Sequence, residues 1–149
     1  AEYSERGDDY LYIADRLVRK MQTAARIAPA PVFRPAAQPT RLGVLYFGST
    51  APAMDEALTL LAAEGIHLDA CRLRAYPFPD AVADFIAAHD AVFVCEQNRD
   101  GQCRQLLLTQ FEPDPKKLKK LLHFDGTPIT ARFIVKAITQ QVHALALPR

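Results

Sequence analysis

Hydrophobic and polar residues follow a helical period at the start of the chain. Between residues 8 and 28, apolar side chains recur every three to four positions, which predicts an amphipathic helix. The apolar stripe of this helix consists of Leu11, Ala14, Val18, Met21 and Ala25. The chain opens at Ala1 without a methionine and enters the helical pattern almost at once. It therefore reads as a piece of a longer polypeptide, and we expect the helix to belong to, or lean on, something upstream.

Proline interrupts the pattern directly after this helix. Four prolines fall within residues 28–39, and proline at this density prevents a helix and favours extended backbone. We therefore expect a stiff connector here. This divides the chain into residues 1–40, a helix and connector from a preceding domain, and residues 41–149, a folded domain of their own.

From residue 41 on, short runs of strand-forming residues alternate with segments of helical period. The expected strands cover residues 41–47, 67–74, 91–95 and 121–124. The expected helices cover residues 52–64, 80–88 and 100–110, and a last helix starts at Thr127 and Pro128 as cap and first residue. In the third helix we expect Cys103, Leu106 and Leu107 to face inward. Such alternation predicts an α/β fold, in which a mainly parallel sheet is covered by helices on both faces.

The composition fits a globular domain and narrows the classes of partner. Half of the 149 residues are hydrophobic, 23% are charged and the net charge is +1, so we expect neither nucleic acid nor a membrane as a partner. The three cysteines, Cys71, Cys95 and Cys103, lack the spacing of a zinc or iron–sulfur site. The four histidines share no ligand spacing either. We therefore expect reduced cysteines in a cytoplasmic protein, and no metal ligands.

Gly48, Ser49 and Thr50 follow the first expected strand of the domain and precede a helix. Because the N-terminus of a helix carries free backbone N–H groups, this segment could hold an anion. It resembles the opening of the flavodoxin phosphate loop, so the alternative function is a flavodoxin-like electron carrier that binds flavin mononucleotide (FMN) here. The continuation Ala51-Pro52 departs from that loop, and a Ser/Thr cap on a buried helix is the simpler interpretation.

A dense polar segment follows the strand at residues 91–95. It begins with Glu96, Gln97, Asn98 and Arg99. Glu96 and Asp100, with Arg99 between them, could form an ion-pair network, and we favour a contact with another domain or subunit over catalysis or a plain solvated loop. Together with Gly48, Ser49 and Thr50, these four residues are the interface candidates, and we name no catalytic, cofactor-binding or metal-binding residue. A lysine patch is interpreted as a solvated face or as a docking site for an acidic partner or phosphate; it contains Lys116, Lys117, Lys119 and Lys120.

Four segments together resemble a known family. They read VLYFGSTAPAMDEAL, LRAYPFP, EQNRDGQ and HFDGTPITARFI. In this order and at similar spacing they resemble the C-terminal domain of the alpha subunit of 2-oxoacid:ferredoxin oxidoreductases, with the 2-oxoglutarate type most similar, over residues 10–138. The resemblance implies a fold like the C-terminal domain of transketolase, which is a three-layer sandwich with a mostly parallel five-stranded sheet between helices.

The resemblance also implies the setting in which the chain works. The whole enzymes decarboxylate a 2-oxoacid on thiamine diphosphate held by Mg²⁺, pass electrons through iron–sulfur clusters to ferredoxin, and deliver the acyl group to coenzyme A. The implied role of this domain is structural, and its partners are the other domains of the alpha subunit and the beta subunit. The chain contains no Gly-Asp-Gly segment for the metal, and its two Asp-Gly pairs are Asp100-Gly101 and Asp125-Gly126. We therefore expect no cofactor in this chain and no activity of the chain alone.

Overall fold

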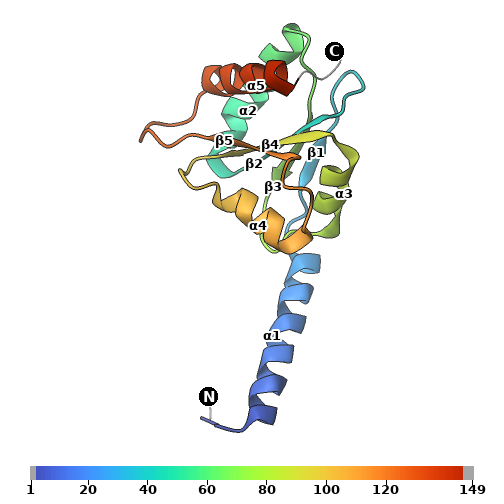
Figure 1. The fold of residues 1–149 in the computed structure, drawn as a ribbon, viewed down its shortest axis with the longest axis vertical. Helices are drawn as coiled ribbons and strands as arrows, with labels where there is room; N and C mark the ends of the chain where they lie inside the picture. Colours follow the sequence, from blue (N-terminus) through green and yellow to red (C-terminus); the bar gives the residue numbers. More distant parts are fainter. Residues whose placement is uncertain (1–2, 146–149) are drawn as a thin grey trace.

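A computed structural model describes residues 3–145 as a sheet between two pairs of helices, with a further helix extending away from it (Figure 1). The helices are α1 (Gly7–Ile27), α2 (Ala51–Ala63), α3 (Asp80–Ala88), α4 (Gln102–Phe111) and α5 (Ala131–Leu145). The strands are β1 (Val32–Arg34), β2 (Leu42–Phe47), β3 (Asp69–Leu73), β4 (Ala91–Glu96) and β5 (Leu118–Leu122). A single 3₁₀ turn, η1 (Gly48–Thr50), joins β2 to α2.

The five strands lie in the order β1-β3-β2-β4-β5. All neighbouring strands are parallel except β1, which runs antiparallel to β3 at the edge of the sheet. Helices cover both faces, with α2 and α5 on one side and α3 and α4 on the other (Figure 1). The predicted fold class, a three-layer α/β sandwich with a mostly parallel five-stranded sheet, is therefore confirmed.

Alternating side chains of the inner strands build the two layers of the core. In β2, Val44 and Tyr46 pack toward α2 and α5, whereas Leu45 packs toward α3 and α4. In β4, Phe93 and Val94 divide in the same way, as the two-residue period of a strand requires. All six residues of β4 are buried, which confirms the predicted interior position of this strand.

The strand β1 was not predicted, because it lies inside the proline-rich connector. Its three residues stand between Pro31 and Pro35, and proline has no N–H group to donate to a ladder. The strand therefore sits at the edge of the sheet and pairs with β3 on one side only. An ion pair between Arg34 and Asp55 also ties this segment to α2. The division of the chain at residue 40 stays a prediction, although part of the expected connector joins the sheet.

Three other predictions of the local structure were wrong. The last strand begins at Leu118, three residues earlier than expected, because Leu118 and Leu121 face the two opposite cores while lysines fill the positions between them. The last helix begins at Ala131 and not at Thr127. Thr127 bonds back to the carboxylate of Asp125, and the hydroxyl of Thr130 accepts the N–H of Phe133 near the start of the helix. Leu106 of α4, expected to be buried, is 43% exposed.

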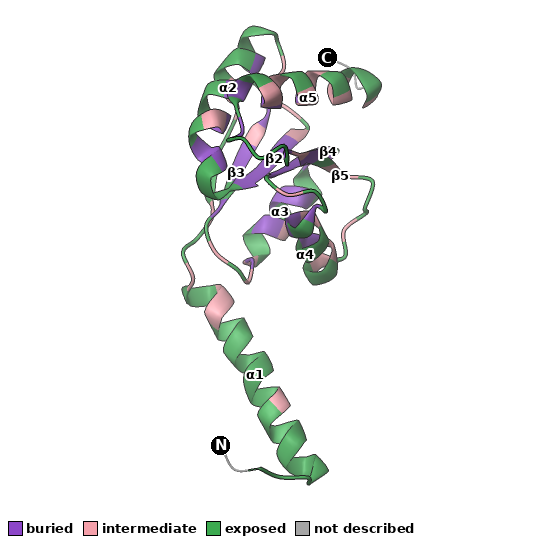
Figure 2. Cartoon of the chain, turned by 90° about the vertical axis from the view of Figure 1, so that its left-hand side faces the viewer, coloured by how far each residue is buried: buried purple, intermediate pink, exposed green. Residues whose placement is uncertain are grey.

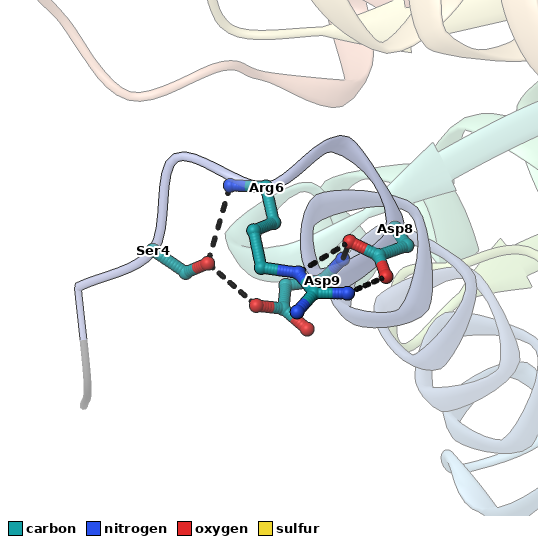
Figure 3. A network of polar contacts seen from close by, with 4 residues as sticks. All are labelled: Ser4, Arg6, Asp8 and Asp9. Atoms are coloured by element: carbon teal, nitrogen blue, oxygen red, sulfur yellow. Dashed lines mark hydrogen bonds and ion pairs between the residues drawn. The ribbon is translucent and has the colours of Figure 1, made fainter.

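The first predicted helix is confirmed as α1, but it does not pack on the sheet. It extends from the body of the domain like a stalk, and none of its residues is buried (Figures 1 and 2). Figure 3 shows the polar contacts at its first turn, where Arg6 pairs with Asp8 at 2.6 Å and lowers the pKa of that carboxyl. The acidic residues Asp8 and Asp9 suit the positive end of the helix dipole.

Candidate docking edge at the carboxyl ends of the strands

The carboxyl ends of β2 and β4 lie side by side, and the two candidate segments meet there. The crossovers leave these two neighbouring strands in opposite directions along the sheet, which is where α/β proteins usually place binding groups. The side-chain amide of Gln97 donates to the hydroxyls of Ser49 at 3.1 Å and of Thr50 at 3.2 Å. The structure thus brings together residues that lie almost fifty positions apart in the sequence.

Glu96 is not on the surface, in contrast to the prediction. Its side chain is fully buried, and its carboxylate accepts the backbone N–H groups of Cys103 at 2.7 Å and Arg104 at 3.1 Å. The amide of Asn98 donates to the same carboxylate at 2.7 Å. The first N–H groups of a helix have no partner within the helix, and its N-terminus favours negative charge. Glu96 therefore fixes α4 to the end of β4 and is not available to a partner.

Asn98 is also committed within the chain. Its side-chain oxygen accepts the backbone N–H groups of Gly101 at 2.7 Å and of Gln102 at 3.2 Å. Gly101 has a φ of +70°, a conformation that glycine adopts without a steric penalty, so the loop can turn sharply into α4. The expected ion-pair network reduces to an exposed pair between Arg99 and Asp100 at 2.8 Å. Of the four polar residues predicted as interface candidates, Arg99 is the one whose charge lies at the surface.

The hydroxyls of Ser49 and Thr50 do not cap α2. Thr50 precedes the helix without a side-chain capping bond, and its buried hydroxyl accepts the Gln97 amide instead. The predicted helix-cap interpretation was therefore wrong. The side-chain amide of Gln97 is hydrogen-bonded to the hydroxyls of Ser49 and Thr50, and this contact is part of the folded domain. Nothing in this geometry favours flavin binding, and we do not propose it.

A hollow of about 420 Å³ lies beside these polar contacts at the same edge. Its lining comes from β2, η1, β3, the loops after β3 and β4, and α4: Phe47, Gly48, Leu73, Arg74, Ala75, Tyr76, Phe78, Asn98, Gln102, Cys103 and Leu106. Three large side chains of this lining are well exposed, at 38% for Phe47, 52% for Tyr76 and 43% for Leu106. We call the hollow and these three side chains the apolar rim. The sequence did not reveal the rim, because Leu106 fits the apolar period of α4 and was expected to face inward.

The thiol that lines the hollow is not arranged for nucleophilic catalysis. Burial raises the pKa of Cys103 to about 12, and it does the same for Cys71 and Cys95. A thiol with such a pKa stays protonated at neutral pH, and the thiolate is the reactive form. All three cysteines are free and buried.

The described residues contain neither a cluster of metal ligands nor a helix that could span a membrane. Residues 3–145 contain no group of three His, Cys, Asp or Glu side chains placed to hold a metal ion. Within the same residues, no helix combines the length and the apolar character needed to cross a bilayer. The buried His89 instead has partners of its own, the carbonyl of Phe85 at 2.6 Å and the carboxylate of Asp69 at 3.0 Å.

This architecture is that of a doubly wound α/β domain whose polar groups at the carboxyl edge largely bond to one another. No family model and no curated protein matches the chain. Several solved structures, however, do resemble the chain. The chain resembles part of the 2-oxoglutarate:ferredoxin oxidoreductase from Magnetococcus marinus, solved with 2-oxoglutarate, coenzyme A and succinyl-CoA bound, with a TM-score of 0.80 and 21% identity over 93% of this chain. The chain spans 24% of the length of that oxidoreductase chain.

Two further structures share the fold. The alpha chain of a probable 2-oxoacid ferredoxin oxidoreductase from Thermoplasma acidophilum matches with a TM-score of 0.51 and 22% identity, over 76% of this chain and 97% of that one. A split-gene transketolase, described as an inactive beta4 tetramer, matches with a TM-score of 0.59 and 18% identity, over 76% of this chain and 42% of that one. At such identities the likeness concerns the fold, which is one found in 2-oxoacid:ferredoxin oxidoreductase and transketolase chains.

Proposed function

We propose that the chain is a structural and docking domain of the alpha subunit of a thiamine-diphosphate-dependent 2-oxoacid:ferredoxin oxidoreductase, of the 2-oxoglutarate type. Such an enzyme oxidatively decarboxylates a 2-oxoacid to an acyl-CoA and passes the electrons to ferredoxin. In this proposal the thiamine diphosphate, Mg²⁺ and iron–sulfur clusters belong to other parts of the assembly. The partners of the chain are the other domains of the alpha subunit and the beta subunit.

The observation that carries the proposal is how far along the chain the similarity to the Magnetococcus enzyme extends. This match covers 93% of the 149 residues. The residues outside the 21-residue helix α1 make up a smaller share of the chain than that, so the match includes part of α1. The other two matches cover 76% of the chain, which the domain without α1 could supply. The shared part thus includes a helix that lies outside the sheet sandwich, and a fold common to many proteins would not require it.

The contacts at the carboxyl edge support docking over catalysis. Glu96, Gln97 and Asn98 each have hydrogen-bond partners within the chain. The apolar rim and the charged side chain of Arg99 are exposed at the same edge. Exposed apolar side chains around a hollow are typical of a surface that another protein covers.

Replacing Leu106 with glutamate should weaken assembly with the rest of the alpha subunit and the beta subunit at least roughly tenfold, because a charge would then be buried in an apolar contact. The matched control is Leu60→Glu, since Leu60 is also a helical leucine with nearly the same exposure, 42%, and lies on α2 away from the rim. Assembly is measured by titrating the labelled chain with the other subunits. Equal affinity of the two variants would contradict docking at the rim.

A further inference from the structure

The sheet ends at β5, and the proposed function makes no use of the free edge of this strand. β5 pairs with β4 on one side only, and α4 and α5 cover the two opposite faces of the sheet beside it (Figure 1). An edge strand presents a row of backbone N–H and C=O groups to which a strand of another chain can bind. The partners of these groups therefore decide what the edge can do.

The hydrogen bonds at the two ends of β5 show which of its backbone groups point outward. In a parallel pair, the N–H and C=O groups of one residue point to the same side, and successive residues alternate between the two sides. The carbonyl of Lys117 accepts the N–H of Val92, and the N–H of His123 donates to the carbonyl of Glu96. The odd-numbered residues of this segment therefore face β4. The even-numbered residues of β5 point outward, and these are Leu118, Lys120 and Leu122.

The carbonyls of the first two outward residues already have side-chain partners. The Nε group of Arg104 donates to the carbonyl of Leu118 at 2.7 Å, and its Nη2 group donates to the carbonyl of Pro115 at 2.8 Å. The side-chain amide of Gln141 donates to the carbonyl of Lys120 at 3.0 Å. Arg104 belongs to α4 and Gln141 belongs to α5. One side chain from each helical layer thus reaches the same edge of the sheet.

We propose that Arg104 and Gln141, which we call the blocking side chains, prevent the edge of β5 from pairing with β5 of a second copy. An added strand needs the outward carbonyls as acceptors as well as the outward N–H groups as donors. With two carbonyls occupied, an approaching strand would have to displace both side chains before it could form its own hydrogen bonds. A second copy is the partner considered because identical edges can pair antiparallel about a twofold axis. This inference does not depend on the proposed function.

The charge of β5 acts in the same direction as the blocking side chains. Lys119 and Lys120 occupy adjacent positions of the strand, and Lys120 is exposed. Lysine on an edge strand disfavours pairing, because two identical strands would bring like charges close together. A test of the blocking side chains must therefore remove part of this charge as well.

Two triple variants that differ at a single position test the proposal. Both carry Arg104→Met and Gln141→Met, which preserve most of the side-chain length and remove the hydrogen-bond donors. The third change is Lys120→Thr in one variant, which keeps the outward N–H group, and Lys120→Pro in the other, which removes it. Because this N–H group takes no part in the pairing with β4, proline is compatible with the position.

Sedimentation equilibrium of the purified chain at about 1 to 100 µM measures self-association. The triple variant with threonine should form a dimer with a dissociation constant at least roughly tenfold below that of the wild type. The triple variant with proline should behave like the wild type. Lys120→Thr alone is the matched control, and it should also behave like the wild type because the blocking side chains are still present.

Circular dichroism of each variant verifies that the domain is folded. If the triple variant with threonine does not fold, Gln141→Met/Lys120→Thr replaces it, because this double variant keeps Arg104 and should still associate more tightly than Lys120→Thr alone. Association no tighter than that of Lys120→Thr alone would overturn the proposal. Unchanged association after Lys120→Pro replaces Lys120→Thr would overturn it too, since the contact would then not involve the edge of β5.

Discussion

Replacing Glu96 with alanine should lower the free energy of unfolding by about 3 kcal/mol. The fully buried carboxylate accepts the backbone N–H groups of Cys103 and Arg104 and the side-chain amide of Asn98. Alanine leaves these donors without their partner and opens a cavity at the junction of β4 and α4. Because a buried donor without an acceptor bears the full cost of its lost hydration, the loss should exceed that of an ordinary hydrogen bond.

The measurement is urea unfolding followed by circular dichroism, with Glu56→Ala as the matched control. Glu56 lies within α2, and its side chain is exposed. Its replacement should change the free energy of unfolding by no more than about 0.5 kcal/mol. Equal losses for the two variants would mean that Glu96 does not anchor α4.

Replacing Gly43 with valine should cost about 2 kcal/mol through overpacking. A Cβ atom at this position of β2 would lie 2.9 Å from Cε1 of Phe85 and 3.2 Å from Cγ of His89. The His89 ring cannot withdraw easily, because it is hydrogen-bonded to the carbonyl of Phe85 and to the carboxylate of Asp69. The Phe85 ring packs against it, with the ring centroids 4.4 Å apart. The absence of a side chain at Gly43 is therefore what lets α3 approach the sheet so closely.

A double-mutant cycle separates this close contact from a general effect on the strand. Phe85→Leu removes the ring atoms that the new side chain would meet. The double variant Gly43→Val/Phe85→Leu should therefore lose less stability than the two single variants lose in sum, measured by the same urea unfolding. Strictly additive losses would contradict the steric explanation.

The sequence predicted elements well where the local pattern and the packing agree. α3 runs from Asp80 to Ala88 as expected, because its apolar period and the prolines before it point to the same limits. β1 could not be found in this way, because three residues between prolines form a strand only when the edge of β3 is there to pair with them. The predicted start of β5 lay three residues too far along the chain. The lysines before Leu121 were interpreted as a solvated loop, although they belong to an edge strand.

The candidate site was predicted in its location but not in its contacts. Parallel topology alone brings the segment after β2 next to the segment after β4, so the contact of Gln97 with Ser49 and Thr50 follows from the order of elements. The burial of Glu96 does not follow from the order of elements. Two of its partners are backbone N–H groups of α4, and backbone groups leave no signal in the sequence that would mark them as partners of Glu96. The exposure of Leu106 depends on where α4 ends its contact with the sheet, and this is a property of tertiary packing.

The most direct test of the proposed role is the 2-oxoglutarate- and coenzyme A-dependent reduction of a viologen dye, with thiamine diphosphate and Mg²⁺ present. It compares the purified chain alone, the remaining parts of the oxidoreductase alone, and the two combined. We predict turnover only from the combined assembly, because in the proposed role this domain holds the other parts in place without taking part in the chemistry. Turnover by the chain alone, or undiminished turnover by the other parts without it, would contradict this account.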